Sequence, residues 1–153
     1  MRHGTADPSM SGGRYGLTRR GREEAEAVAG ALKHLGLRPS KIWHSSKTRA
    51  IETADILRLR LMPGLACELK PGLLPEDSAE QMAEVIDAYA IEHPGENLFI
   101  VSHIPMLPAL TFRLLGSMDA TPSFPPAGCL WIENPNAGPW KVKSFWNPVD
   151  LLS

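Results

Sequence analysis

The stretch Asn97-Leu98-Phe99-Ile100-Val101-Ser102-His103-Ile104-Pro105 (residues 97–105) indicates the fold class of this chain. Its first six residues contain a continuous apolar run over 98–101, which is typical of a parallel strand buried on both faces. A histidine follows, and residues 106–115 then predict a helix, into which Pro108 fits only in the first turn. We therefore expect a central parallel strand that leads directly into a helix.

The rest of the chain alternates strands and helices in the same way. Hydrophobic periodicity and capping residues predict helices over 18–35, where Thr18 is the N-cap, over 47–61 and over 78–93, and strands over 41–45 and within 66–75. Residues 129–133 and 140–146 predict an antiparallel hairpin. This order favours a single α/β domain over residues 1–153: a three-layer α/β/α sandwich with a mostly parallel sheet and right-handed crossovers. Ligands in such sheets bind at the carboxyl ends of the strands.

Composition excludes several classes of protein. With 43% apolar residues, 22% charged residues and a net charge of −1, the chain is neither a disordered tail nor a membrane protein, and it does not favour nucleic acid as a partner. The charge is uneven: residues 1–60 carry twelve basic and six acidic residues, a net of +6, against four and eleven, a net of −7, in 61–153. The basic part faces a small anion or is an ordinary solvated surface.

Two cysteines, Cys67 and Cys129, stand 62 positions apart and fit neither a disulfide framework nor a zinc site. We expect reduced thiols in a cytoplasmic protein that is a monomer or a small homo-oligomer, without a membrane partner.

Three segments carry the chemistry: Arg2-His3-Gly4, Ser45-Ser46-Lys47-Thr48-Arg49 and Val101-Ser102-His103-Ile104-Pro105. The last two follow predicted strands directly, so Arg49 and His103 should converge at one end of the sheet. Two arginines and two histidines would make a strong phosphate site, because guanidinium groups form bidentate bonds to phosphoryl oxygens and imidazole supplies a nucleophile or a donor. Taken alone, His103 would more often be structural and Arg49 a surface charge. The remaining histidines show no ligand spacing: His34, His44 and His93.

These segments resemble the successive signatures of the histidine phosphatase (phosphoglycerate mutase-like) superfamily. The matching motifs are residues 1–4 (MRHG), Leu17-Thr18 with Gly21, residues 45–54 (SSKTRAIETA) and residues 101–105 (VSHIP). They occur in the right order over residues 1–105. The short chain leaves little room for a cap domain, so it is most similar to the SixA-type phosphohistidine phosphatases.

The resemblance implies that His3 is the nucleophile and that Arg2, Arg49 and His103 hold the phosphoryl oxygens, without a metal ion or another cofactor. Physical chemistry agrees, since phosphoryl transfer needs mainly positioning and charge stabilisation. The arginines should depress the pKa of His3 and keep it neutral, whereas His103 would act best as a protonated donor once a dianion is bound.

A carboxylate after the second motif usually serves as the general acid in this family. The candidates are Glu68, Glu76 and Asp77; we rank Glu76 first, because residues 74–76 (LPE) resemble the loop that borders the site. Phosphohistidine phosphatases of this type can lack such an acid. Ser102 and Thr5 are either peripheral contacts or structural hydrogen-bonding residues.

The sequence thus predicts a metal-independent phosphatase that hydrolyses phosphohistidine or a small phosphomonoester through a phosphohistidine on His3. A broad-specificity phosphomonoesterase and a non-catalytic module that binds phosphate or a phosphoprotein are the alternatives. The loops Thr5 to Gly16 and Thr121 to Gly128, which would choose the substrate, carry no diagnostic motif.

One departure from the family concerns the first strand. Family members have a strand of several residues before the Arg-His-Gly motif, whereas His3 is the third residue here. We expect the first strand of the sheet to be missing from this sequence. Either the sequence starts at an internal methionine of a longer product, which we favour, or another segment, such as a partner's, completes the sheet. An apolar strand added upstream should make the protein more stable and more active.

Overall fold

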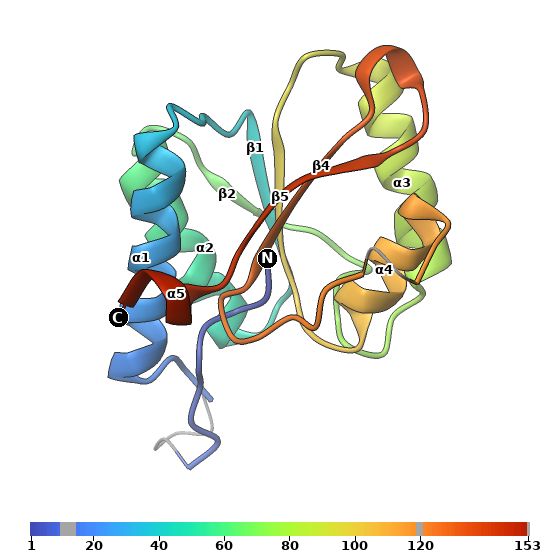
Figure 1. The fold of residues 1–153 in the computed structure, drawn as a ribbon. Helices are drawn as coiled ribbons and strands as arrows, with labels where there is room; N and C mark the ends of the chain where they lie inside the picture. Colours follow the sequence, from blue (N-terminus) through green and yellow to red (C-terminus); the bar gives the residue numbers. More distant parts are fainter. Residues whose placement is uncertain (10–14, 119–120, 153) are drawn as a thin grey trace.

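Strands and helices alternate along the chain in the computed structural model, which describes residues 1–9, 15–118 and 121–152. The strands β1 (Lys41–His44), β2 (Cys67–Leu69) and β3 (Leu98–Val101) form a parallel sheet in the order β2-β1-β3, and β4 (Cys129–Glu133) and β5 (Lys141–Trp146) form an antiparallel hairpin. The helices are α1 (Arg19–His34), α2 (Thr48–Leu61), α3 (Ala79–Glu92), α4 (Met106–Leu115) and α5 (Pro148–Leu152). Helices α1 and α2 lie on one side of the strands and α3 and α4 on the other (Figure 1). The predicted α/β class and hairpin are confirmed; α5 was not predicted.

Local signals place the helix ends as the sequence predicts. The Thr18 side chain accepts a hydrogen bond from the Gly21 amide at the start of α1, and Ser78 does the same for Gln81 at the start of α3. Gly36, at φ +73°, follows α1 in a conformation that glycine adopts without strain. None of the described helices is long and apolar enough to span a bilayer.

The main core lies between α1, α2 and the parallel sheet. Small and branched side chains on α1 and α2 face each other there, together with Ile42 and Val101: Ala25, Val28, Ala29, Leu32, Ala50, Ala54 and Leu57. A second cluster packs α3 and α4 against the other face, around Trp43. Both clusters hold β1 and β3 in place, and these strands carry site segments at their carboxyl ends.

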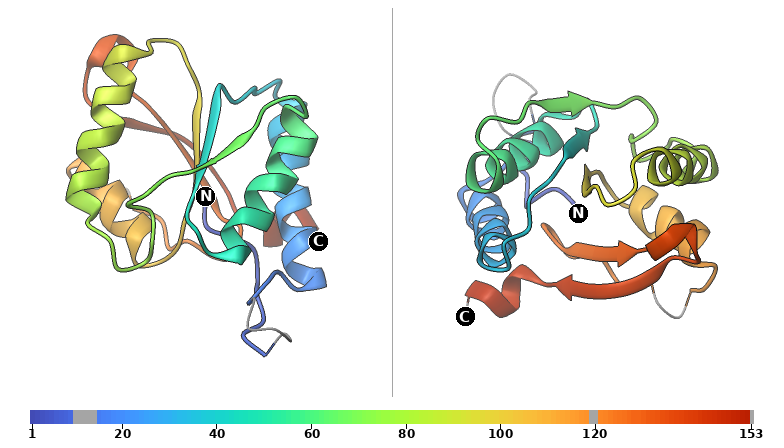
Figure 2. Two further views of the ribbon diagram at one scale, coloured as in Figure 1. Left: turned by 180° about the vertical axis from the view of Figure 1, so that it is seen from behind. Right: turned by 90° about the horizontal axis from the view of Figure 1, so that it is seen from above.

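Residues 1–3 lie between β3 and the start of β4. Arg2 forms a parallel bridge with Ser102, and the terminal ammonium of Met1 donates to the carbonyl oxygen of Ile100 at 2.8 Å. On the other side the Arg2 amide donates to the Gly128 carbonyl and the Ala127 amide to the His3 carbonyl, each at 2.9 Å. Figure 2 shows the N-terminus between β3 and β4. This short segment therefore joins the parallel sheet to the hairpin.

Beyond that segment the two sheets are separated by a cleft. The prediction of a central strand buried on both faces is wrong for residues 97–102, because β1 is central and Leu98–Ile100 remain half-buried. A cleft of about 650 Å³ runs along β3, and it is lined by Ile100 and by Trp131 of β4 among other apolar residues. The open edge of β3 explains its exposure.

Candidate active site

The three chemistry-bearing segments meet at the carboxyl ends of β1 and β3. The ring centroids of His3 and His103 are 5.1 Å apart, and Arg49 Nε lies 3.3 Å from His3 Nε2. Burial lowers the pKa of His103 most, and the charges of Arg49 and Arg2 add to that effect. The structure therefore brings together four of the five residues assigned to the site from the sequence.

The His3 side chain is only 8% exposed and has a defined tautomer. Its Nδ1 lies 2.7 Å from the Gly4 carbonyl oxygen, and because a carbonyl only accepts, Nδ1 carries the hydrogen. Nε2 is then the unprotonated nitrogen, and it accepts from Arg49 Nε. Burial, followed by the Arg49 and Arg2 charges, lowers the pKa of His3 to about 4 against the opposing hydrogen bond to Gly4. At neutral pH the ring presents a lone pair beside a guanidinium.

Both arginines are held by neighbouring loops. Arg2 Nη1 donates to the Phe124 carbonyl at 2.9 Å, while its buried Nε has no hydrogen-bond partner among the described residues. The guanidinium of Arg49 lies under the Tyr15 ring, 4.2 Å from its centroid. Sequence reasoning did not find Tyr15, because the loop before α1 shows no motif; residues 10–14 of that loop lie outside the described part of the chain.

Gly4 and Gly21 allow the backbone beside His3 to lie against the start of α1. A Cβ at Gly4 would stand 2.4 Å from the Gly21 carbonyl oxygen, and a Cβ at Gly21 only 2.0 Å from the Thr5 carbonyl oxygen. The Gly4 amide donates to Thr53 Oγ1 at 3.1 Å, and the Thr53 hydroxyl donates to the Arg49 carbonyl at 2.8 Å. Thr53 thus ties the His3 segment to the helix that carries Arg49.

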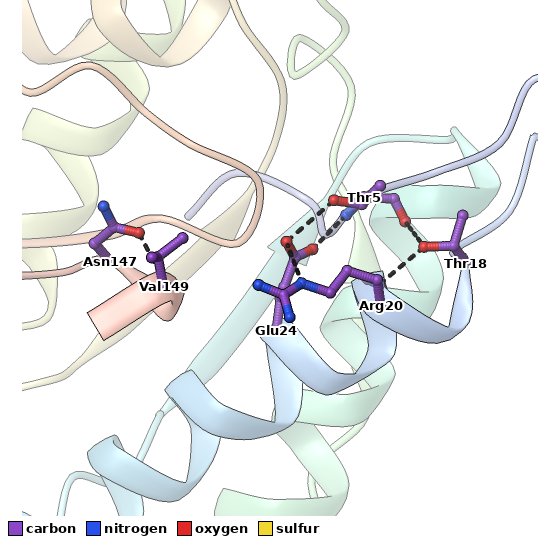
Figure 3. A network of polar contacts seen from close by, with 7 residues as sticks. Thr5, Thr18, Arg20, Glu24, Asn147 and Val149 are labelled. Carbon is purple, nitrogen blue, oxygen red and sulfur yellow. Dashed lines mark hydrogen bonds and ion pairs between the residues drawn. The ribbon is translucent and has the colours of Figure 1, made fainter. Parts of the chain in front are cut away.

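Thr5 is occupied by a structural contact. Its amide and its hydroxyl both donate to the buried carboxylate of Glu24, at 2.9 and 3.1 Å, and Arg20 forms an ion pair with the same group (Figure 3). Of the two roles that the sequence left open for Thr5, its contacts favour anchoring the chain after the Arg-His-Gly motif.

His103 is 1% exposed, and its ring forms one hydrogen bond with the described residues, in which Nε2 lies 2.6 Å from Ser45 Oγ. Burial first, then the charges of His3, Arg49, Lys47 and Arg2, lower the pKa of His103 to about 3. The ring is therefore neutral at pH 7, and the protonated donor expected from the sequence needs a bound anion.

The three candidate acids have different surroundings. Glu68 lies on β2 and contacts Lys41 Nζ and Trp43 Nε1, each at 3.2 Å. Asp77 accepts from the Leu74 amide within its own loop. Glu76 is exposed and forms no hydrogen bond or ion pair with any residue that the structure describes.

Ser102 secures the loop that carries these residues. Its buried hydroxyl donates to the Leu73 carbonyl at 2.7 Å, which fixes residues 71–77 to the end of β3. This contact favours a structural role for Ser102, and the structure does not join Glu76 to the other four site residues. Among the described residues there is also no group of three or more His, Cys, Asp or Glu side chains that could hold a metal ion.

Known proteins resemble this chain in sequence and in fold. Residues 1–74 match the family model of the histidine phosphatase superfamily (branch 1). The human mitochondrial serine/threonine-protein phosphatase PGAM5 is 52% identical over 60 residues, which are 39% of this chain and 20% of that protein. The chain thus aligns with about one fifth of the length of this curated relative.

Solved structures match over nearly the whole chain. The protein histidine phosphatase SixA complexed with tungstate has a TM-score of 0.88 at 22% identity and covers 99% of this chain and 96% of its own. The putative phosphohistidine phosphatase SixA from Agrobacterium tumefaciens has a TM-score of 0.79 at 24% identity and covers 97% and 95%. The fold predicted from the sequence motifs is confirmed by these neighbours.

Proposed function

We propose that this chain, whose resemblance to the histidine phosphatase superfamily is confirmed by the match over residues 1–74, is a phosphatase that needs no metal ion. Its substrate is phosphohistidine or a small phosphomonoester. One observation carries the proposal: the unprotonated Nε2 of buried His3 stands 3.3 Å from Arg49 Nε, so a nucleophile and a phosphate-binding cation share one site.

The reaction would run in two displacements. Arg2 and Arg49 bind the phosphoryl oxygens by charge-assisted hydrogen bonds. His3 Nε2 forms a bond to phosphorus while the bond from phosphorus to the leaving oxygen or nitrogen breaks, and the leaving atom keeps the electron pair and takes a proton from Glu76 or from water. Water then attacks the phosphorus, the electron pair of the N–P bond returns to Nε2, and inorganic phosphate leaves.

The low pKa of His3 suits this role, because nearly all of the protein presents the neutral nucleophile at pH 7. His103 would contact a phosphoryl oxygen from the side of the site opposite the two arginines. A bound dianion favours its protonated form by adding negative charge beside the ring, so it becomes a donor when the substrate arrives.

Phosphohistidine is the substrate that we favour. The support is the likeness over nearly the whole chain to structures named as histidine phosphatases, together with the exposed position of Glu76. A phosphoramidate has a basic leaving nitrogen that solvent can protonate, so an acid held in the site is not required. The two free cysteines, Cys67 and Cys129, fit the reducing cytoplasm that we propose as its compartment.

The test follows the phosphoryl group onto the protein. Wild type, His3→Asn and His34→Asn are incubated with a ³²P-phosphohistidine peptide and with a labelled aryl phosphate, then quenched at alkaline pH to preserve phosphohistidine. We expect label on His3 and turnover in wild type and in His34→Asn, whose exchanged residue is exposed on α1. Turnover that survives His3→Asn would refute the mechanism, and phosphate binding without turnover would identify a binding module instead.

A further inference from the structure

Ser45 lies directly against the ring of His103. It follows β1, is 1% exposed and places its Oγ 2.6 Å from His103 Nε2. Ser45 stands in the motif that also contains Arg49, but the sequence alone indicates no role for it. The distance is that of a strong hydrogen bond between two buried groups.

The Ser45 hydroxyl can serve either protonation state of the ring. The Lys47 amide donates to Oγ at 3.3 Å, which uses one lone pair and leaves a second lone pair and the hydroxyl hydrogen. If Nε2 carries a lone pair, the hydroxyl donates to it. If Nε2 carries a hydrogen, Oγ accepts it. Only a rotation of the O–H bond separates the two states, so protonation of His103 breaks no hydrogen bond.

No other polar group that the structure describes holds the ring. Nδ1 of His103 is buried and has no hydrogen-bond partner among the described residues, and the contact with His3 is a tilted ring pair at 5.1 Å. The charged or titratable groups around His103 are His3, Arg49, Lys47 and Arg2, and none of them offers a carboxylate acceptor to an imidazolium. The orientation of Nε2 and its ability to carry a proton therefore depend on Ser45.

We propose that Ser45 is the positioning residue of His103: it holds Nε2, so that Nδ1, which has no hydrogen-bond partner among the described residues, is left to face the phosphoryl group, and it accepts the Nε2 hydrogen when the ring becomes protonated. This inference rests on the proposed phosphatase function for its kinetic consequences. The hydrogen bond itself exists in the free protein and can be tested without any reaction.

The kinetic arm compares Ser45→Ala, Ser45→Thr and Ser45→Cys with Ser46→Ala, in which an exposed neighbouring hydroxyl is removed. We expect Ser45→Ala to lower kcat about 10- to 100-fold with KM changed less than about threefold, because the defect lies in orientation. The acid limb of its pH profile should also move. Ser45→Thr keeps the hydroxyl and should have a kcat within a few fold of wild type. Ser45→Cys has a side chain of similar size to serine but only a weak hydrogen-bonding group, so it should behave like Ser45→Ala. Ser46→Ala should match wild type.

The spectroscopic arm records the ¹⁵N resonances of the His103 ring, first in the free protein and then with inorganic phosphate. We expect the Nε2 resonance to shift in Ser45→Ala and in Ser45→Cys, and to return towards wild type in Ser45→Thr. An unchanged Nε2 resonance, or wild-type kcat and pH profile in Ser45→Ala or Ser45→Cys, would overturn the inference. If wild type shows no turnover while the resonance still responds to Ser45, the proposed function fails and the placement of His103 by Ser45 stands.

Discussion

Replacing Gly21 by alanine tests whether close backbone packing places the nucleophile. The new Cβ would lie 2.0 Å from the Thr5 carbonyl oxygen, 2.8 Å from its amide nitrogen and 2.9 Å from its carbonyl carbon, all of them backbone atoms. A comfortable contact needs about 3.4 Å, so α1 and the segment after His3 would have to separate by more than about 1 Å.

The free energy of unfolding should fall by about 2 kcal/mol. Forced overpacking costs about 3 kcal/mol when the neighbour is rigid. Alanine in place of glycine returns about 1 kcal/mol of helix propensity. Gly30→Ala on the same helix is the matched control, since its Cβ would meet only the flexible tip of Arg60, at 3.2 Å from Nη2. There the propensity gain remains, and the protein should become more stable by up to about 1 kcal/mol.

The assay is urea unfolding of wild type and both variants, followed by the phosphatase assay on the folded proteins. We expect a difference of about 3 kcal/mol between the two variants, and a lowered kcat only in Gly21→Ala, where His3 moves with Gly4. Equal stability of Gly21→Ala and Gly30→Ala would refute the reasoning, because each variant replaces one glycine of the same helix by alanine and the two differ in what the new Cβ meets.

Three further predictions concern pH, capping and the cleft. The pKa values of His3 and His103, about 4 and 3, lie below the ordinary value of 6.5. As the pH falls, these histidines therefore bind protons at a higher pH in the unfolded chain than in the folded protein. The two histidines should therefore make the free energy of unfolding fall from pH 6.5 towards pH 4, with a shallower fall in His3→Asn. Thr18→Ala should cost about 1 kcal/mol in urea unfolding through loss of the N-cap of α1, and an unchanged midpoint would contradict that role. Five apolar, β-forming residues added before Met1 should fill the cleft and raise the free energy of unfolding by about 2 kcal/mol or more, and equal stability of both forms would show that no strand pairs there.

Much of the fold was predictable because its signals are local. Thr18 and Ser78 cap helices through their own side chains, and the apolar spacing of α1 fixes its buried face. The order of the strands in the sheet, in contrast, depends on contacts between residues that are far apart in the sequence. The run over residues 97–102 reads as a buried central strand, but its burial depends on what pairs with its far edge, and that edge faces the cleft.

The candidate site divides in the same way. The sequence motifs pointed to Arg2, His3, Arg49 and His103. They lie together because Arg2, His3 and His103 stand at or next to a bridge, while Arg49 lies in the first turn of α2, the helix that follows β1. The sequence did not indicate Ser45 or Tyr15, because their roles depend on contacts between distant residues: Ser45 contacts His103, and Tyr15 contacts Arg49. Glu76 was chosen by loop resemblance alone, and its exposed side chain forms no hydrogen bond or ion pair with the described residues.

The hydrogen bonds around residues 1–3 indicate that filling the cleft should affect the stability of the protein more than its catalytic rate. The backbone of His3 is fixed on both sides, because its amide donates to the Ser102 carbonyl and its carbonyl accepts from the Ala127 amide. The ammonium of Met1, in contrast, is buried against the Ile100 carbonyl, and burial lowers its pKa. An added strand would replace this charged group by an amide that makes the same hydrogen bond without the desolvation cost of a charge. It would also cover the open edge of β3. Filling the cleft should therefore raise stability strongly and kcat less, whereas Gly21→Ala, which acts on the other side of His3, should lower both.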